Sequence, residues 1–248
     1  MLTNFYLIGV KRQDFRLDFS SLTRIYLTNF RSKTMSTQKL YLTSFSEMQG
    51  TAQITYIQYG DKPFVRLDRT LFHPQGGGQK ADKGTISGVS VVHVDQSNDE
   101  VNHYLETVES FTVGQQVEMK VDETWRLING KYHLAGHLIA SLMENLFPGV
   151  QAMGGHHWPG EARIELTGNL PNIEEVNELL SAALTKAIDA DLPVSICGDP
   201  FSNRSIAIGD FMAVPCGGTH PESLGVLGKV EITKLKIKKD KLRVSYRV

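Results

Sequence analysis

The chain has 248 residues with a nearly balanced charge, 26 Lys and Arg against 27 Asp and Glu, and 41% hydrophobic residues. That length supports one large domain or two modest ones, and the composition excludes global disorder. No run approaches the roughly 18 apolar residues of a membrane-spanning helix, so no membrane partner is expected. Two cysteines do not make a disulfide framework, which predicts a reducing, cytoplasmic location.

The charge is unevenly distributed along the chain. Residues 1–34 hold six basic groups against two acidic ones, a net of +4, and residues 229–248 hold eight against two, a net of +6, which leaves −11 for the middle. An acidic body with a basic tail is a common layout for contact with a polyanion at one face. A solvated, lysine-rich hairpin explains the tail equally well, and charge alone does not separate the two interpretations.

The first 34 residues have no clear hydrophobic period, and Met35 follows them. Three interpretations compete: a mis-assigned start with Met35 as the initiator, an Arg-rich targeting peptide, and a structural extension. Asp14 and Asp18 argue against the targeting peptide, and residues 1–10 lack the basic group that precedes the apolar stretch of a secretory signal. The mis-assigned start is the favoured interpretation.

Short β-strands are predicted from about Thr51 to Asp122. These segments are β-branched or alternate between apolar and polar residues, with Gly and Asp between them. They are 52–58, 64–68, 89–95 and 116–121. Several short strands at this spacing are typical of a small β-barrel. Residues 74–79 are too rich in glycine for a strand or a helix and predict a loop.

The pattern changes at Glu123, where apolar residues begin to recur at helical spacing and continue to Pro148. A second helix is predicted from about Ile173 to Ile188, with Asn172 as its N-cap. Further strands are predicted at 163–166, 194–197, 226–237 and 241–248. The fold class is therefore α+β, with two helices against an antiparallel sheet in the C-terminal half. The predicted parts are an extension (1–34), a β-barrel domain (35–122) and an α+β domain (123–248).

Two short motifs carry potential metal ligands. His133 and His137 lie four residues apart on the first predicted helix, so both imidazoles share one face and can reach one ion. Cys216 and His220 flank Gly-Gly-Thr, whose glycines give the backbone freedom to turn both side chains toward one ion. Each pair alone also fits surface histidines, or a turn with a chance histidine. Together they offer three nitrogens and one sulfur, a set suited to one Zn²⁺ per chain.

The remaining cysteine and histidines are less informative. Cys197 ends an apolar strand and is expected to be a small buried core residue. Isolated histidines in the β-rich half usually serve packing or the surface. These are His73, His93 and His103. His156 and His157 precede the strand at 163–166 and are candidates for a pocket near the metal.

These motifs resemble a known family. His133-Leu-Ala-Gly-His137 together with Cys216-Gly-Gly-Thr-His220 is similar to the editing domain shared by alanyl- and threonyl-tRNA synthetases and by freestanding alanyl-tRNA editing proteins of the AlaX type. The Cys-Gly-Gly-Thr-His form resembles the alanyl branch more than the threonyl one. The Gly-rich stretch 68–84 resembles the N-terminal barrel motif of the same family.

The resemblance covers about residues 52–248 and implies a function. His73 stands where the family usually has Tyr, and residues 153–158 differ from the alanyl synthetases. The family implies hydrolysis in trans of tRNA(Ala) that carries serine or glycine instead of alanine. No adenylate-forming domain and no phosphate-binding loop is visible in the sequence, so neither an ATP site nor ligase activity is expected.

The chemistry of an aminoacyl ester agrees with this resemblance. The ester is already reactive, and zinc polarises a carbonyl or lowers the pKa of a bound water to about 7. Four protein ligands describe a structural zinc site, whereas three ligands and a water describe a catalytic one. The sequence leaves open whether all four residues bind the ion at once.

Several polar residues are candidates for contact with the substrate. A pocket that binds the serine hydroxyl leaves its own polar group unpaired when alanine enters, and His156 is the first candidate for that role. The candidates for the amine, the ester or the terminal adenosine are Gln79, Arg163 and Thr219. The tRNA body is expected to bind the basic hairpin through its phosphates. The candidates there are Lys234, Lys236, Lys238, Lys239 and Arg243.

Two rival functions stay open. One is a non-catalytic tRNA-binding module that zinc only stabilises. The other is the editing of a different aminoacyl-tRNA, such as seryl-tRNA(Thr). Both are separated from the favoured function by measuring deacylation of the corresponding aminoacyl-tRNAs.

Overall fold

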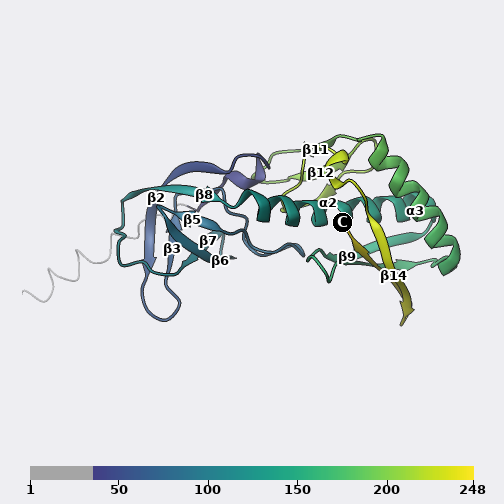
Figure 1. Cartoon of the computed structure of the whole chain (residues 1–248), viewed down its shortest axis with the longest axis horizontal. Coiled ribbons are helices and arrows are strands. Elements are labelled where there is room, and N and C mark those ends of the chain that lie inside the picture. The colour runs from purple at the N-terminus through teal and green to yellow at the C-terminus, as the bar shows by residue number, and fades with distance from the viewer. Residues whose placement is uncertain (1–35) are drawn as a thin grey trace, which may run out of the picture. The chain divides into compact units, whose positions relative to one another are not determined.

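The computed structural model describes residues 36–248 (Figure 1). The interpretations of residues 1–34 lie outside this range. The described residues contain two long α-helices and several β-sheets, which confirms the predicted α+β class. No helix in this range is both long and apolar enough to cross a membrane.

Six strands close into a β-barrel in the order β2-β3-β7-β6-β5-β8. They are β2 (Gln49–Gln58), β3 (Phe64–Leu67), β5 (Gly84–Ile86), β6 (Val89–Ser97), β7 (Glu100–Leu105) and β8 (Gln116–Val121). Alternation fills the barrel: in β8 every second residue is buried, namely Val117, Met119 and Val121. Three short elements are not part of the barrel order. β1 (Gln38–Lys39) pairs in parallel with β4 (Arg69–Thr70), and η1 (Leu40–Leu42) follows β1.

His103 of β7 is a fully buried polar residue of the barrel. Its ring nitrogens lie 2.7 Å from Thr70 Oγ1 and 3.2 Å from the carbonyl oxygen of Val65. The carbonyl can only accept, so Nδ1 donates to it and Nε2 accepts from the threonine hydroxyl. Burial lowers the pKa of His103 to about 4, so the ring is neutral at neutral pH. Of the two roles expected for this histidine, packing and the surface, the structure shows packing.

A buried ion pair ties the start of the long helix to the barrel. Arg126 and Asp82 are 0% and 1% exposed, and the same guanidinium donates to the carbonyl oxygen of Leu71 at 2.6 Å. The carboxylate also accepts from the backbone N–H of His73 at 2.6 Å. These extra hydrogen bonds offset part of the desolvation of the two charges. Leu71 and His73 precede the Gly-rich loop 74–79, and Asp82 follows it. The ion pair therefore holds both ends of the loop against the helix.

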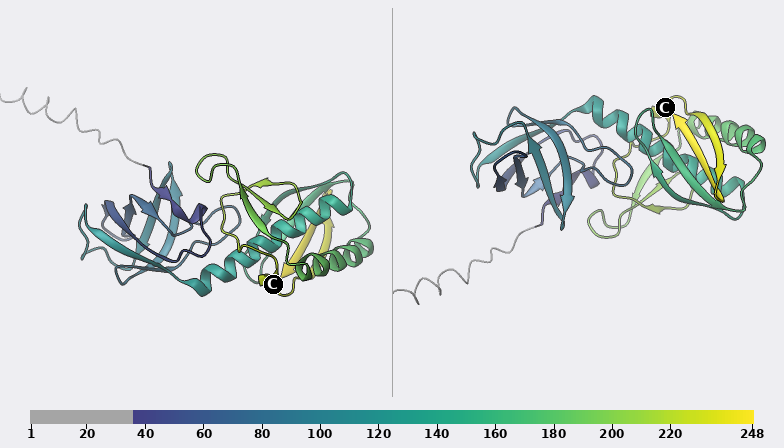
Figure 2. Two further views of the ribbon diagram at one scale, coloured as in Figure 1. Left: turned by 90° about the horizontal axis from the view of Figure 1, so that it is seen from above. Right: turned by 90° about the horizontal axis from the view of Figure 1, so that it is seen from below.

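The C-terminal half packs two helices on one face of a four-stranded antiparallel sheet (Figure 2). α2 (Glu123–Leu146) begins at the N-cap Asp122, whose carboxylate accepts a backbone hydrogen bond of the first turn. α3 (Ile173–Asp189) begins at Asn172, which caps the helix as predicted. The strand order is β14-β15-β10-β9. The strands are β9 (Val150–His156), β10 (Arg163–Gly168), β14 (Glu231–Lys238) and β15 (Lys241–Arg247).

Two strands of this sheet differ from the prediction. β14 begins at Glu231 rather than at 226, because η2 (Gly225–Leu227) precedes it and Gly228 follows with φ 68°, a left-handed conformation that breaks an extended run. β9 is absent from the prediction, because Gly154 and Gly155 hide its alternation. A separate three-stranded sheet has the order β11-β12-β13. It consists of β11 (Val194–Cys197), β12 (Ser205–Ile208) and β13 (Val214–Pro215).

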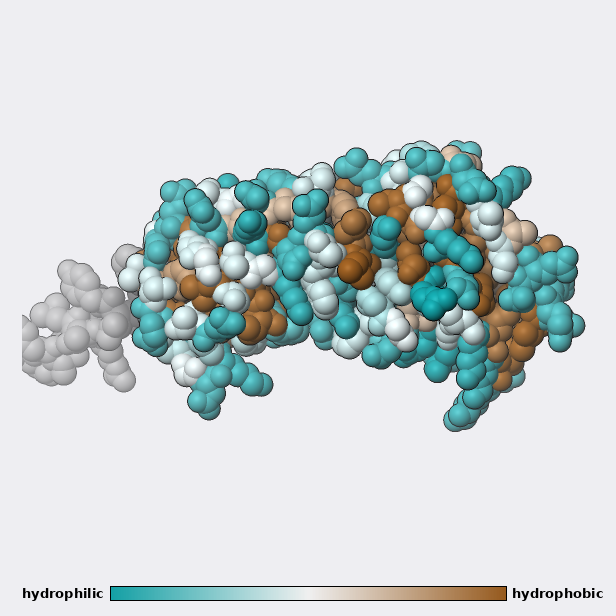
Figure 3. All heavy atoms as spheres, in the orientation of Figure 1, coloured by the Kyte–Doolittle hydropathy of each residue, from teal (hydrophilic) through white to brown (hydrophobic). Residues whose placement is uncertain are grey.

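The face of the four-stranded sheet that points away from the helices is rich in basic side chains. Strand register places one cross-strand row on it: His156, Arg163, Ser245 and Lys234. The neighbouring row consists of Gly154, Glu165, Arg243 and Lys236. The alternate residues face the helices and are buried, such as Ile164 and Val244. We call the outward side the basic face, defined by Arg163, Lys234, Lys236, Lys238, Lys241 and Arg243. Hydrophilic side chains project from the tip of its β14–β15 hairpin (Figure 3).

Candidate metal centre

Four side chains that are far apart in the sequence converge on one point. His133 and His137 project from α2, and Cys216 and His220 follow β13. One ligand atom from each residue lies within 4.8 Å of the other three. Cys216 Sγ lies 3.3 Å from Nε2 of His137 and 3.5 Å from Nε2 of both His133 and His220. The structure therefore brings together the four residues that the sequence predicted as ligands.

The distances from the sulfur to the three nitrogens fit a tetrahedral metal site. With a Zn–S bond of about 2.3 Å and Zn–N bonds of about 2.0–2.1 Å, tetrahedral angles place sulfur and nitrogen about 3.5 Å apart. The three observed sulfur–nitrogen distances are 3.3, 3.5 and 3.5 Å. Three imidazoles and a thiol are also donors that zinc prefers. The cluster can hold a metal ion, and its donors are consistent with zinc.

Burial sets the protonation of the four groups. It lowers the pKa of His137 to about 4, and together with the neighbouring imidazoles it lowers those of His133 and His220 well below the ordinary value. Burial also raises the pKa of the Cys216 thiol, although the Gly218 backbone N–H acts in the opposite direction. The histidines are therefore in the neutral form that binds metals, and the thiol would release its proton on binding.

Gln79 of the Gly-rich loop holds His133 in place. Its Oε1 lies 2.7 Å from Nδ1 of His133 and accepts from the backbone N–H of Thr219 at 3.0 Å. Its Nε2 donates to the hydroxyl of Thr219 at 2.7 Å. Because Oε1 can only accept, Nδ1 carries the proton and Nε2 of His133 keeps its lone pair. Gln79 and Thr219 are 0% and 1% exposed, so the structure places them behind a predicted ligand. Their contact with substrate stays a prediction.

His157 stacks on the ring of His133, with centroids 4.7 Å apart and planes at 13°. Its Nδ1 lies 2.7 Å from the hydroxyl of Tyr246, which itself donates to the carbonyl oxygen of Tyr132 at 2.8 Å. The hydroxyl of Tyr246 has one proton, which it donates to the carbonyl oxygen. Nδ1 of His157 is therefore the donor in its hydrogen bond with the hydroxyl oxygen. Nε2 is therefore unprotonated, and burial lowers the pKa of His157 to about 3 and keeps the ring neutral.

Three glycines make room for the ring of His157. A Cβ at Gly136 or at Gly155 would lie 2.3 Å from its Cε1, and one at Gly78 would lie 2.9 Å from its Cδ2. Gly136 is in the middle of α2, where glycine costs about 1 kcal/mol relative to alanine. The close approach of the imidazole explains this glycine. The sequence analysis favoured His156 over His157 for contact with the serine hydroxyl. A glycine inside a predicted helix was the one feature of the sequence that could indicate the close packing of His157.

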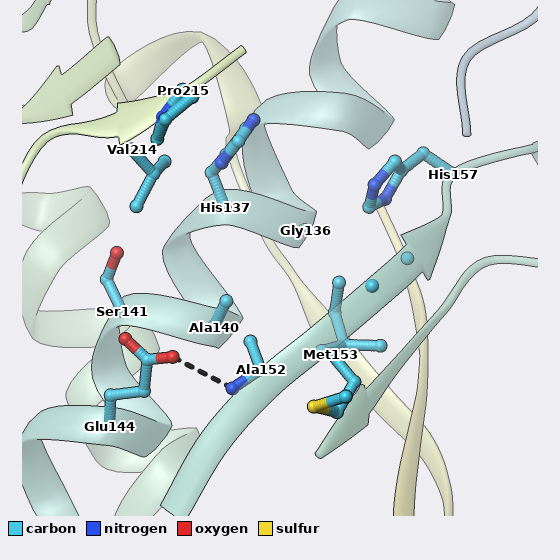
Figure 4. A pocket seen from close by; sticks show the side chains of 13 residues that line it. Gly136, His137, Ala140, Ser141, Glu144, Ala152, Met153, His157, Val214 and Pro215 are labelled. Carbon is cyan, nitrogen blue, oxygen red and sulfur yellow. Dashed lines mark hydrogen bonds between the residues drawn. The ribbon is translucent and has the colours of Figure 1, made fainter. Parts of the chain in front are cut away.

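A pocket of about 280 Å³ lies beside the cluster. His137 and His157 line one part of it, and Ser141 and Glu144 follow His137 along α2 (Figure 4). One carboxylate oxygen of Glu144 accepts from the backbone N–H of Ala152 at 2.8 Å. The apolar wall includes Met153, Ile164, Val214 and Pro215. The sequence did not single out Ser141 and Glu144, because polar residues on an amphipathic helix are ordinarily solvated.

The other predicted substrate contacts lie on the basic face. His156 and His157 are consecutive in extended chain and point to opposite sides, so His156 faces outward beside Arg163. A hollow of about 380 Å³ further along this face is lined mostly by basic side chains. The predicted tRNA contacts among them are Lys236, Lys238, Lys239 and Arg243. Arg243 also pairs with Glu165 at 2.6 Å. Binding of tRNA by this hollow, and of substrate by His156 and Arg163, stays a prediction.

One expectation about a cysteine is wrong. Cys197 is half-buried rather than a core residue. It ends β11, which is an edge strand of the three-stranded sheet, and the neighbouring Ile196 is 41% exposed. An apolar run on an edge strand does not by itself imply burial.

Comparison with known proteins agrees with this geometry. Residues 11–125 match the family model described as tRNA synthetases class II (A). The chain is 31% identical over 173 residues to the alanyl-tRNA editing protein AlaX-M of Pyrococcus horikoshii, a match that covers 68% of this chain and 79% of the relative. It is 30% identical over 195 residues to AlaX-L of the same organism, with 70% and 48% covered. It is 29% identical over 205 residues to the alanine–tRNA ligase of Acidithiobacillus ferridurans, with 73% and 23% covered.

An α+β fold that places three histidines and a cysteine beside a pocket defines a class of potential metalloproteins. Within that class the chain belongs to the family of alanyl-tRNA editing proteins, which the match to most of AlaX-M shows. The matched region spans about half of AlaX-L and less than a quarter of the ligase.

Proposed function

We propose that this protein hydrolyses, in trans, the ester bond of tRNA(Ala) mischarged with serine or glycine, as a zinc-dependent aminoacyl-tRNA hydrolase. The observation that carries the proposal is the convergence of His133, His137, Cys216 and His220 beside a pocket. The relatives named as alanyl-tRNA editing proteins support the choice of tRNA. The donor set supports zinc, at one ion per chain.

The cluster and its neighbours can divide the work of ester hydrolysis. A zinc ion held by these residues would supply a Lewis acid for the ester carbonyl if one of the four left its place to the substrate, or if the ion took a fifth ligand. Among the four, His137 lines the pocket, so we place the ester beside this residue. Gln79 keeps the lone pair of His133 Nε2 free by accepting a hydrogen bond from the N–H at Nδ1. These contacts hold the ligands in place before the substrate binds, and such rigid placement of the groups around the reacting bond is a main source of catalytic rate.

We assign recognition of the serine hydroxyl to His157. Its unprotonated Nε2 can accept a hydrogen bond from that hydroxyl, and the ring lines the pocket. Alanine has no hydroxyl and leaves the acceptor unpaired, which disfavours hydrolysis of correctly charged tRNA. Glu144, further along the pocket, offers a carboxylate to the cationic amino group of the substrate. His157 takes the place of His156 in this role because His156 faces the other side of the strand.

We propose that the basic face binds the phosphates of the tRNA. Its lysines and arginines lie on one side of a rigid sheet, and such contacts are salt-sensitive and largely independent of sequence.

We also propose the domain boundary between residues 122 and 123. Two separate hydrophobic cores support it, one in the barrel and one between α2, α3 and the four-stranded sheet.

The rival function is a non-catalytic tRNA-binding module in which zinc only stabilises the fold. The test measures deacylation of seryl-, glycyl- and alanyl-tRNA(Ala) by the zinc-loaded chain. We expect turnover of the seryl and glycyl esters and little turnover of the alanyl ester. Intact tRNA binding without turnover of any ester would support the binding module. Faster turnover of seryl-tRNA(Thr) than of seryl-tRNA(Ala) would reassign the substrate.

A further inference from the structure

The two tryptophans of the chain lie in one row with two lysines and a histidine. The ammonium nitrogen of Lys83 is 4.0 Å from the ring centroid of Trp125. That of Lys80 is 5.6 Å from the same ring and 4.8 Å from the ring of Trp158. The ring of Trp158 packs in turn on His156, with centroids 4.7 Å apart. We call these five residues the aromatic row.

The aromatic row begins one residue away from the metal centre along two separate segments. Gln79 and His157 both contact a predicted ligand, and they directly precede Lys80 and Trp158. Consecutive Cα atoms are about 3.8 Å apart, so the row directly borders the centre. The backbone N–H of His157 donates to the carbonyl oxygen of Gly78 at 2.9 Å, which fixes the two segments against each other.

The row also meets the pocket and the basic face. His156 lines a hollow of about 430 Å³ together with Arg163 and Lys241. Residues 153–155 line both this hollow and the pocket beside the cluster. Because β9 is an edge strand of its sheet, a chain whose end lies in the pocket can pass over 153–155 at this edge and reach the aromatic row.

The contacts of the row leave groups free for a ligand. Within the described residues, no carboxylate pairs with Lys80 or Lys83, whose ammonium groups lie on ring faces instead. Trp125 donates its indole N–H to a backbone carbonyl at 2.9 Å, which gives this residue a structural role. Trp158 has no such bond within the described residues. The acidic residues beside the row have other partners or lie at its margin: Asp82 pairs with Arg126, Asp122 caps α2, and Glu161 lies 3.6 Å from His156 and is 65% exposed.

We propose that the aromatic row binds the single-stranded 3′ end of the RNA whose terminal nucleotide carries the ester into the pocket. Trp158 and His156 offer rings on which unpaired bases stack, and Lys80 and Lys83 offer ammonium groups to the phosphates between them. Aromatic faces combined with cations are the usual composition of single-strand binding surfaces. The inference rests on the proposed function, because the row is useful to an RNA only when its end lies in the pocket.

Tryptophan fluorescence tests this proposal directly, because both tryptophans of the chain belong to the row. Trp125→Phe leaves Trp158 as the only tryptophan, Trp158→Phe leaves Trp125, and selective excitation of tryptophan avoids the tyrosines. Each full-length variant is titrated with a short single-stranded RNA that has the 3′ sequence of tRNA(Ala) and carries no amino acid. It is also titrated with a blunt RNA duplex. We expect saturable quenching of Trp158 by the single strand, much weaker quenching of Trp125, and none by the duplex. No quenching of Trp158, or equal quenching by the duplex, overturns the proposal.

A kinetic comparison separates this inference from the proposed function. Stacking of one base on an aromatic ring corresponds to about a 5- to 150-fold change in affinity, so Trp158→Ala should raise KM for seryl-tRNA(Ala) by that factor with little change in kcat. Tyr59→Ala removes an aromatic ring that is 54% exposed on the barrel and should leave KM unchanged. If the parent protein deacylates the substrate while Trp158→Ala keeps its KM, only the row proposal fails. If the parent neither binds nor deacylates tRNA, the proposed function fails and the row proposal with it.

Discussion

Replacing Gln79 by leucine tests whether this residue supports the metal centre or contacts the substrate. Leucine has a side chain of similar size to glutamine but no polar atoms. The substitution therefore removes the hydrogen-bond partner of three buried groups: Nδ1 of His133, and the backbone N–H and hydroxyl of Thr219. Gln79 is 0% exposed, so water does not replace the amide. Each buried group without a partner costs about 1–3 kcal/mol. Because the groups adjoin each other their costs are not additive, and we expect the free energy of unfolding to fall by about 3–5 kcal/mol.

The same substitution should weaken the metal site. Removing the hydrogen-bond partner behind a metal-binding histidine lowers metal affinity about 10- to 100-fold. Gln79→Glu is the matched control, since a carboxylate keeps an acceptor for Nδ1 of His133 and is a common partner of zinc-bound histidines. Competition with a chromophoric chelator measures both variants. We expect the zinc affinity of Gln79→Glu to stay near that of the parent protein and that of Gln79→Leu to fall.

The opposite outcome would restore the prediction made from the sequence. If Gln79 contacts the substrate, Gln79→Leu keeps the zinc affinity of the parent protein and raises KM for seryl-tRNA(Ala). That result would refute the reasoning from the buried hydrogen bonds. Circular dichroism and thermal melting of both variants show whether any loss of zinc comes from unfolding instead.

Three further predictions concern the ligand set, the basic face and the barrel core. Cys216→Ala should lower the zinc content per chain and Cys197→Ala should not, as elemental analysis of the purified proteins would show; equal losses contradict the assignment. Charge reversal at Lys236 and Lys238 should weaken tRNA binding and reduce the slope of log K against log salt by about 1 per lost phosphate contact, whereas unchanged affinity means a solvated surface. The pKa of His103 is lowered from its ordinary 6.5 to about 4 in the folded protein. The neutral ring therefore contributes fully to the free energy of unfolding above pH 6.5, and this contribution falls by about 3 kcal/mol as the pH is lowered to 4. Urea unfolding should show the stability gap between the parent protein and His103→Gln narrowing over that range, and a constant gap would contradict the shift.

Elements with a strong local period are predictable from this sequence. β8 and β11 have their predicted bounds, and α2 begins at the predicted residue, because alternation, helical spacing and an N-cap are properties of neighbouring residues. The ligand set is also local in part. His133 and His137 form one pair and Cys216 and His220 another, and only the meeting of the two pairs depends on the fold.

The sequence named His157, together with His156, as a candidate for a pocket near the metal, and His157 lines that pocket. It did not predict which groups Gln79 and His157 contact, because those contacts join distant parts of the chain. Gln79 reaches a helix 54 residues further on and a turn 140 residues further on. His157 reaches Tyr246 across 89 residues. A polar residue gives the same local pattern whether its partner is a substrate, a backbone amide or another ring. Only the three-dimensional arrangement decides which of these it is.

The glycines show the same point from the opposite side. In sequence, a Gly-rich loop and a glycine inside a helix each weaken a prediction of regular structure. In the structure, Gly78, Gly136 and Gly155 come from a loop, a helix and a strand, and each leaves the space of one Cβ to the ring of His157. Alanine at position 136 would favour the helix by about 1 kcal/mol but would overlap that ring. The helix therefore gives up local stability at the residue where the imidazole packs against it, so all three segments contribute to the placement of one ring.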